Sequence, residues 1–159
     1  MPSPRAVGAC NGGAMIRSSA VFTILGALGS AAVVRAQATH VSDSSAAAAV
    51  VNDYLQGLQF NDTLRLAKAF WPSPKLLWVK RDSTLGELTQ TAWYASFRGS
   101  VGQRVEGTLR MVKLELTGSA AAAKVVEEYP DSRYTDYLGL LRIAGRWWIV
   151  SKLYVAERR

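Results

Sequence analysis

The hydrophobic residues of this 159-residue chain change their spacing part-way along, and that change constrains the fold more than any other feature. Between residues 42 and 59 they recur every three or four positions, which is typical of one face of a helix. From residue 103 onward they recur every second position, which is typical of strands with one buried face. Helices gathered before a run of neighbouring strands predict an α+β domain whose helices cover one face of a sheet.

Three helices are expected before this run. The first runs from Ser42 to Gln59 with Ser42 or Ser44 as its cap, and one of its faces carries Ala47, Val50, Val51, Tyr54, Leu55 and Leu58. The second covers residues 63–70, with Asp62 as its cap and Pro72 and Pro74 ending it. The third covers residues 89–97 and is capped by Thr89.

Five strands are expected. One covers residues 75–81, between the second and third helices. In the next, Val112, Leu114 and Leu116 alternate with charged residues. The remaining strands, 121–129, 133–143 and 146–156, follow turns at Gly118-Ser119, Pro130-Asp131-Ser132 and Ala144-Gly145.

The first 38 residues have the pattern of a secretory signal. Arg5 and Arg17 are the only charged residues before Arg35, residues 20–34 are uncharged and mostly apolar, and Ala36 and Ala38 form a small-residue exit. This predicts a signal peptide over residues 1–38, a single domain over residues 39–159, and export to the periplasm or the medium. Two alternatives stay open: translation from Met15, and an apolar segment retained as an anchor. After cleavage no membrane span is expected, because the apolar segment is the only candidate.

Composition excludes several kinds of site from residues 39–159. The single cysteine, Cys10, precedes them, so they have no disulfide, thiolate metal site or catalytic thiol. The single histidine, His40, lies at the edge of the domain, which argues against a histidine-based triad or metal site, and no cofactor is expected. The formal net charge is +7, but no basic run is longer than two residues, as at Lys80-Arg81, so no nucleic-acid partner is expected.

Two stretches carry a resemblance to a known family. Residues 136–154 (DYLGLLRIAGRWWIVSKLY) match the D-Y-L-x-L-L-x-x-x-G-x-W-x-I-V-x-K-x-Y pattern of the putative lumazine-binding family, which belongs to the nuclear transport factor 2-like superfamily. Tyr54-Leu55-Gln56-Gly57, Asp62 and the stretch 68–72 (KAFWP) resemble its opening, Y-x-x-G…D…K-A-F-H-P. The chain departs from the pattern at Trp71, where the family usually has a histidine.

The resemblance implies a cone in which N-terminal helices pack on a curved antiparallel sheet around a ligand-sized cavity. Proteins of this fold include ketosteroid isomerase, polyketide cyclases, dehydratases and modules that only bind, so the fold does not decide the chemistry. Tyr54 stands where ketosteroid isomerase has its tyrosine, but the two carboxylate positions of that enzyme fall near Val79 and Gly139. The catalytic set is therefore incomplete, which favours a protein without catalysis.

Strand parity predicts which side chains face the helices. Across the Ala144-Gly145 hairpin, Asp136, Leu138, Leu140 and Arg142 share a face with Trp147, Ile149, Ser151 and Leu153, whereas Lys152 and Tyr154 face away. Asp136 among apolar neighbours is expected to have a raised pKa, which would suit an acid or base. The alternative is a structural carboxylate that accepts hydrogen bonds from nearby backbone or from Tyr54.

These patterns predict a small apolar or heterocyclic ligand, with core filling as the alternative role for each aromatic residue. The expected ligand-binding residues are Tyr54, Trp78, Trp93, Phe97, Asp136, Leu138 and Trp147. An isomerase, cyclase or dehydratase using Asp136 and Tyr54 is the enzymatic alternative, and an interaction module with a filled cavity is a third. An apolar outer face bearing Leu141, Ile143, Trp148, Val150 and Tyr154 predicts a homodimer through the sheet.

Overall fold

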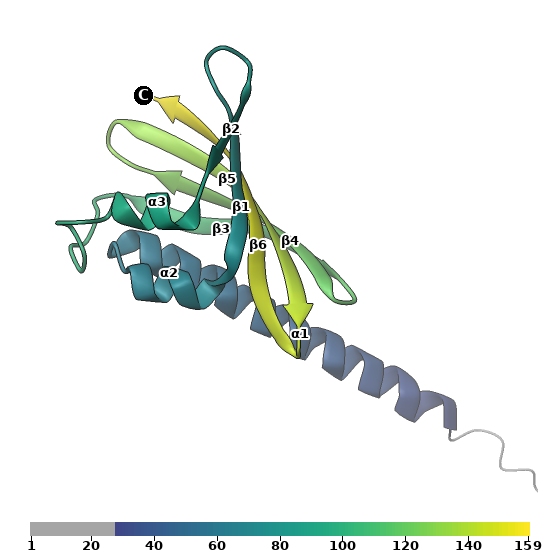
Figure 1. Ribbon diagram of the computed structural model, residues 1–159. Helices are drawn as coiled ribbons and strands as arrows, with labels where there is room; N and C mark the ends of the chain where they lie inside the picture. Colours follow the sequence, from purple (N-terminus) through teal and green to yellow (C-terminus); the bar gives the residue numbers. More distant parts are fainter. Residues whose placement is uncertain (1–27) are drawn as a thin grey trace, which may run out of the picture.

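The computed structural model describes residues 28–159, and their side chains from Asp43 onward. Helix α1 (Leu28–Gln59), helix α2 (Thr63–Ala69) and helix α3 (Gln90–Ala95) lie on one face of a six-stranded sheet that curves around them without closing (Figure 1). The α+β cone expected from the sequence is confirmed. The expected start at Met15, Cys10 and most of the expected signal segment lie outside the described residues.

The first helix begins earlier than expected. Its start at Leu28 places Ser42 and Ser44 within the helix, so the prediction that one of them caps it is wrong. The stretch before residue 42 contains several alanines, which favour helix and extend it toward the N-terminus. Its C-terminal half lies under the sheet, where Ala47, Val51 and Tyr54 are fully buried as the spacing predicted. None of the helices in the described part of the chain is long and apolar enough to cross a membrane.

The two short helices have the predicted caps. The Asp62 side chain accepts a hydrogen bond from the Arg65 backbone N–H at 3.0 Å, and Thr89 Oγ1 accepts one from Ala92 N–H at 3.2 Å. These bonds satisfy N–H groups that have no partner within the first helical turn. The two caps orient α2 and α3. Helix α3 in turn places Trp93 against Tyr54 and Phe70.

The strands follow the order β2-β1-β6-β5-β4-β3 across the sheet. They are β1 (Phe70–Val79), β2 (Leu85–Leu88), β3 (Thr108–Thr117), β4 (Ala120–Glu128), β5 (Ser132–Ile143) and β6 (Arg146–Arg158). The expectation of a wholly antiparallel sheet is wrong at one place, because β1 pairs with β6 in parallel. β1 also starts before residue 75; its pairing with β6 is irregular between Phe70 and Lys75, where two prolines lack the N–H for a regular ladder. The short strand β2 was not anticipated.

A tight turn joins β5 to β6, as the sequence predicted. Ala144 and Gly145 both have positive φ, 49° and 80°, which is the backbone of a type I′ turn. This turn matches the twist of the two strands and fixes their register at its end, where Ile143 pairs with Arg146.

Two β-bulges change which residues face the helices. In β3 the register shifts between Met111 and Lys113, so Val112 is turned outward and is 47% exposed, contrary to its expected buried position. In β6, Leu140 pairs with Ile149 but Gly139 pairs with Ser151, which leaves Val150 as the extra residue.

The bulge at Val150 reverses the parity of the rest of β6. Trp147 and Ile149, before the bulge, are buried against the helices as predicted. After it, Lys152 is the residue on the inner face, with only 6% of its surface exposed, and Leu153 is 50% exposed on the outer face. The predicted orientations of Ser151, Lys152, Leu153 and Tyr154 are therefore wrong, because an extra residue in one strand exchanges the two faces beyond it.

The outer face also differs from the expected patch. Trp148 is partly covered by the Arg146 guanidinium, 3.8 Å from the ring centre, and contacts the edge of Trp71. Tyr154 lies toward the inner face. Exposed apolar residues gather further along the strands around the half-buried Leu77. We term this set the outer apolar patch: Leu77, Val79, Leu85, Tyr137, Leu153 and Val155.

Candidate functional site

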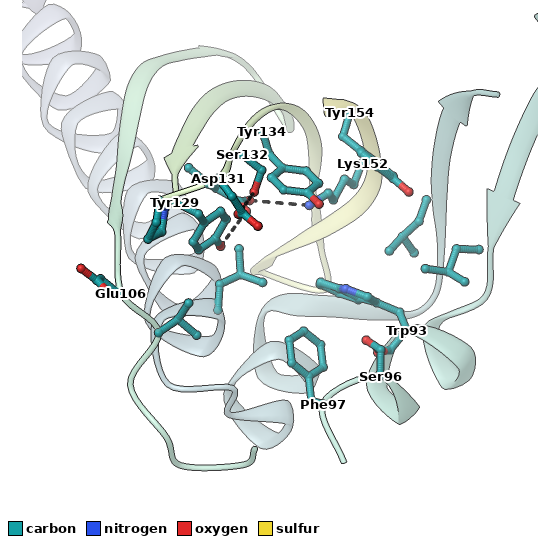
Figure 2. A pocket seen from close by; sticks show the side chains of 16 residues that line it. Trp93, Ser96, Phe97, Glu106, Tyr129, Asp131, Ser132, Tyr134, Lys152 and Tyr154 are labelled. Atoms are coloured by element: carbon teal, nitrogen blue, oxygen red, sulfur yellow. Dashed lines mark hydrogen bonds and ion pairs between the residues drawn. The ribbon is translucent and has the colours of Figure 1, made fainter. Parts of the chain in front are cut away.

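A cavity of about 500 Å³ opens between α3, the loop that follows it and the inner face of the sheet (Figure 2). Aromatic side chains form much of its wall: Trp93, Phe97, Tyr129, Tyr134 and Tyr154. Glu127 and Lys152 reach the same cavity from β4 and β6, and both are almost completely buried. An apolar wall with a few polar groups is the usual arrangement of a small-molecule site.

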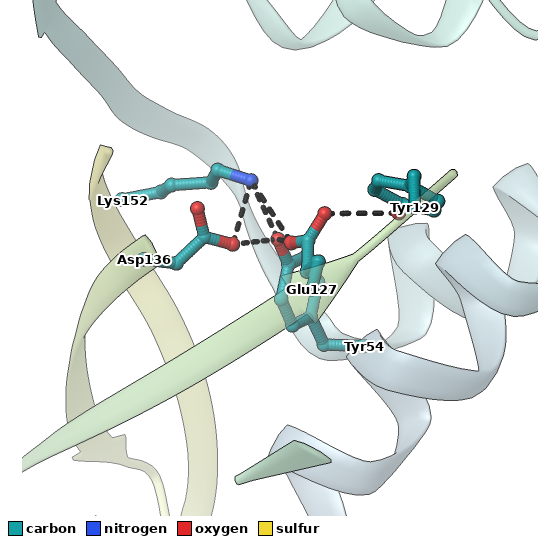
Figure 3. A network of polar contacts seen from close by, with 5 residues as sticks. All are labelled: Tyr54, Glu127, Tyr129, Asp136 and Lys152. Atoms are coloured by element: carbon teal, nitrogen blue, oxygen red, sulfur yellow. Dashed lines mark hydrogen bonds and ion pairs between the residues drawn. The ribbon is translucent and has the colours of Figure 1, made fainter. Parts of the chain in front are cut away.

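Four side chains from four elements meet beneath this cavity, and we term them the buried network: Tyr54, Glu127, Asp136 and Lys152 (Figure 3). Tyr54 projects from the apolar face of α1, the face that packs against the sheet. Strand register brings the other three together, because Val125 pairs with Asp136 and Leu138 pairs with Lys152. Alternate residues of a strand share a face, so Glu127 lies beside Asp136 on the inner surface.

Lys152 is the donor at the centre of the buried network. Its Nζ donates to the Tyr54 hydroxyl at 2.6 Å and to Asp136 Oδ2 at 2.8 Å, and lies 3.7 Å from Glu127 Oε1. The Tyr54 hydroxyl lies within hydrogen-bonding distance of both carboxylates, with Glu127 Oε1 at 2.9 Å. Because this hydroxyl has one proton, it can donate to only one of them at a time.

Asp136 is a structural ion rather than the proton donor that its apolar neighbours suggested. Burial acts to raise its pKa, but the Lys152 ammonium and the hydrogen bonds around it outweigh burial and hold the pKa below its ordinary value. The prediction of a raised pKa for Asp136 is therefore wrong, because the regular alternation assumed for the strand placed Lys152 on the outer face of the sheet. The alternative interpretation, acceptance of a hydrogen bond from Tyr54, agrees with the structure.

Lys152 remains a cation within the buried network. Burial acts to lower its pKa, but the negative charges of Asp136 and Glu127 outweigh burial and raise the pKa above its ordinary value. Its Nζ also lies 5.2 Å from the centre of the Tyr154 ring and 5.6 Å from that of Trp93, which adds a favourable cation–π contribution. A lysine that stays protonated acts as a charge and a hydrogen-bond donor, not as a nucleophilic amine.

Glu127, rather than Asp136, has the raised pKa that was expected of a buried carboxyl group at this site. Its side chain is buried, with 4% of the residue surface exposed, and burial raises its pKa to about 7 despite the opposing charge of Lys152. Tyr129 donates a hydrogen bond to its second oxygen, Oε2, at 3.0 Å. A carboxyl group that titrates near neutral pH at a cavity wall can both accept and donate a proton.

The residues predicted to bind a ligand fall into four places. Trp93 and Phe97 line the cavity. Tyr54 and Asp136 lie beneath it in the buried network, and Leu138 and Trp147 belong to the hydrophobic core. Trp78 lies against Tyr154, with ring centres 5.4 Å apart, and lines a separate hollow of about 410 Å³ beside the outer apolar patch.

Sequence reasoning did not identify Glu127, Tyr129, Tyr134 or Lys152 as cavity residues. One signal for Lys152 was present: Gly139 interrupts an otherwise regular strand, and an isolated glycine in a strand often marks a bulge or a close approach. A side-chain carbon at Gly139 would lie 2.5 Å from Ser151 Oγ, the residue paired with it beside the bulge.

Comparison with known proteins agrees with this architecture. Residues 42–155 match the model of a family described as putative lumazine-binding. The chain belongs to this family. Its matched region includes α2, α3, strands β1 to β5, most of β6 and every residue of the buried network.

Individual relatives are distant in sequence. The chain is 23% identical over 119 residues to the aldolase FrzH of Cladobotryum sp., covering 74% of this chain and 95% of that protein. An NTF2-like protein of unknown function from Shewanella baltica superposes with a TM-score of 0.66 at 23% identity, covering 74% of this chain and 95% of that one. A putative scytalone dehydratase from Novosphingobium aromaticivorans gives 0.56 at 13% identity, covering 77% and 91%. At such identities the structural likeness establishes the fold alone.

Proposed function

We propose that the protein binds a small, planar aromatic or heterocyclic molecule in the cavity, with a carbonyl or acidic oxygen of that molecule accepting a hydrogen bond from Lys152. The observation that carries this proposal is a buried ammonium group at the wall of an aromatic-lined cavity of about 500 Å³. This volume lies within the range of several hundred Å³ that ligand sites occupy.

The aromatic wall supports a flat ligand. Trp93 and Phe97 approach from α3 and the residues after it, with ring centres 5.7 Å apart, while Tyr134 and Tyr154 approach from the sheet. Offset or edge contacts with such rings favour an aromatic partner beyond the area that it buries. The family description, putative lumazine-binding, is consistent with this class, because lumazine is a planar heterocycle with carbonyl oxygens.

Lys152 supports an oxygen acceptor on the ligand. An ammonium group has three N–H donors, and the hydrogen bonds of the described residues use two of them, to Tyr54 and Asp136. A third donor at the cavity wall would be satisfied by a carbonyl or acidic oxygen. Such a charge-assisted bond is stronger than one between neutral groups.

Tryptophan fluorescence tests this proposal, because Trp93 lies in the cavity wall. We expect saturable quenching by lumazine and by 2-tetralone, an aromatic ketone, each used as a probe of the ligand class. Phe97→Ala should weaken binding about threefold to tenfold by removing one aromatic wall. Leu85→Ala, in the outer apolar patch, is the matched control and should bind as the wild type does. If neither probe quenches the fluorescence of the wild-type protein at millimolar concentration, the proposal is contradicted.

We also propose that residues 1–38 direct export and are then removed. The charged start, the uncharged apolar segment and the small residues before Thr39 support this. Intact-mass measurement of the protein from its own host should give the mass of residues 39–159. A mass that includes the apolar segment would instead support a retained anchor.

A homodimer through the sheet is a further part of the proposal. The outer apolar patch supports it, because Val79, Leu85, Leu153 and Val155 expose large apolar side chains to solvent. Contiguous exposed apolar residues commonly mark an interface with another protein, and a second copy of the chain is the commonest partner. Sedimentation equilibrium measures the subunit count directly.

A further inference from the structure

We propose that the cavity is a proton-transfer site in which Glu127 removes a proton from the carbon next to a ligand carbonyl while Lys152 holds the carbonyl oxygen. This inference rests on the binding proposed above and adds a reaction to it. The substrate class is a small aromatic or heterocyclic ketone with an acidic C–H beside its carbonyl group.

The spacing of the two groups suits this reaction. Glu127 Oε1 and Lys152 Nζ are 3.7 Å apart (Figure 3). Both residues line the cavity. In a ketone, the acidic carbon and the carbonyl oxygen are separated by two bonds. A base and a donor that act on them together must therefore lie within a few ångströms of each other, each within hydrogen-bonding distance of its target.

The surrounding groups hold Glu127 in a usable state. Tyr129 donates to its Oε2 and so orients the carboxyl group, leaving Oε1 beside Lys152. The single proton of Tyr54 can be donated to Asp136 instead of Glu127, which leaves Oε1 able to accept a proton from the ligand. Its pKa of about 7 supports the role, because a base that titrates near the working pH is present in both forms.

Neither other ionised group of the network suits the role of base. Asp136 does not line the cavity, and its lowered pKa leaves it ionised as the partner of Lys152. Lys152 is kept protonated by two carboxylates, so it cannot attack a carbonyl as a free amine. The arrangement therefore separates the base from the group that stabilises negative charge.

The step is balanced within the site. The Glu127 carboxylate takes the proton, the C–H electron pair forms a carbon–carbon double bond, and the carbonyl π pair moves onto oxygen. The resulting enolate oxygen carries a negative charge that the Lys152 ammonium stabilises in a water-poor environment. Return of the proton from Glu127 regenerates the ketone, so no oxidant, reductant or further reactant is needed.

Hydrogen–deuterium exchange of 2-tetralone in D₂O, followed by NMR, tests the inference. Wild-type protein should accelerate exchange of the protons beside the carbonyl above the buffer rate, and Glu127→Gln should lose about 100-fold or more of this acceleration while still binding 2-tetralone. The matched control is Glu128→Gln, which changes the next carboxylate on the same strand and should exchange as the wild type does.

A second measurement requires no variant. The exchange rate should rise with pH and level off above about 7 as Glu127 loses its proton. The groups that face Glu127 are Tyr54 from α1, Tyr129 beyond the end of β4, Asp136 from β5 and Lys152 from β6, with Glu106 and Asp131 elsewhere in the cavity wall. Of these, Tyr54, Tyr129 and Lys152 have raised pKa values and Asp136 a lowered one, so none of the four titrates near pH 7.

The outcomes separate this inference from the proposed function. Binding of 2-tetralone without exchange above the buffer rate overturns the inference alone, as does full exchange by a folded Glu127→Gln variant. If lumazine binds and 2-tetralone does not, the ketone substrate class is wrong while the proposed binding stands. If neither probe binds, both fail.

Discussion

Lys152 and Asp136 depend on each other, because each would be an unpaired buried charge without its partner. Replacing Lys152 with methionine keeps the length of the side chain and removes its charge. The carboxylates of Asp136 and Glu127 would then lack a counter-ion, which typically costs about 3–5 kcal/mol of folding free energy. Urea unfolding should show this loss for Lys152→Met.

The double variant Asp136→Asn with Lys152→Met should recover part of that loss, because both members of the pair are then neutral. Lys113→Met is the matched control: Lys113 pairs with Glu115 at 2.7 Å on the surface, with 64% of its side chain exposed, and should change stability by less than about 1 kcal/mol. A similar small change for Lys152→Met would show that the buried pair is not an essential ion pair.

Glu127 should give the protein an unusual dependence of stability on pH. Its pKa is about 7 in the folded state against an ordinary 4.5, so between these values the folded state holds a proton that the unfolded state has lost. The contribution of Glu127 to the free energy of unfolding is fully present below pH 4.5. It declines by on the order of 3 kcal/mol as the pH rises to about 7. Asp136 acts in the opposite sense, since its lowered pKa contributes stability that is lost in acid.

Denaturant unfolding across pH isolates this effect. Glu127→Gln stays neutral, so its free energy of unfolding should lack the decline between pH 4.5 and 7. Glu128→Gln should keep the decline. Equal pH profiles for the wild type and Glu127→Gln would show that the burial of Glu127 does not perturb its titration.

At the level of single elements, local chemistry accounts for much of what the sequence predicted. Asp62 and Thr89 cap their helices through short-range hydrogen bonds, and Ala144-Gly145 turns the chain in two residues. These features depend on neighbours in the chain and can be read from them. The bulge at Val150 depends instead on how β5 and β6 fit together across the sheet, and it decides that Lys152 enters the network. The candidate site was therefore harder to predict than the fold.

The β5–β6 turn offers a test at this level. Ala144 has φ of 49°, in the left-handed region that asparagine tolerates better than alanine. Ala144→Asn should raise the free energy of unfolding by roughly 0.5 kcal/mol, whereas Ala144→Val should lower it by about 1 kcal/mol because a branched side chain resists positive φ. Thermal unfolding of the two variants measures both changes. The same sign for both would contradict the assigned turn geometry.

For the whole molecule, the order of periodic segments was enough to predict helices on one face of a sheet, and the family resemblance implied that the sheet is curved. It could not predict that β1 pairs in parallel with β6, because the partners are distant in the chain. It also misplaced the exposed apolar residues, since the bulge exchanges the faces of β6. These differences concern contacts between segments distant in the chain, of which the isolated Gly139 was the one local sign.

The proposed dimer leads to a prediction for the whole molecule. Leu153→Glu introduces a charge into the outer apolar patch at a residue that is already half exposed, so the monomer should still fold. Sedimentation should then show a monomer where the wild type is a dimer. Val101→Glu, at an exposed apolar residue in the loop after α3, is the control and should remain dimeric. A monomeric wild-type protein would contradict the proposal.

The parallel pairing of β1 with β6 also bears on how the chain acquires its structure. β6 lies between β1 and β5 at the middle of the sheet, so the centre cannot assemble until residue 158 has been synthesised. Contacts between distant segments make folding slow, since loop closure must precede the interactions that stabilise it. The nascent chain is therefore held back from completing the sheet until β6 has been synthesised. The proposed export would benefit from this delay, because a translocation channel that admits only extended chains requires a chain that has not yet folded.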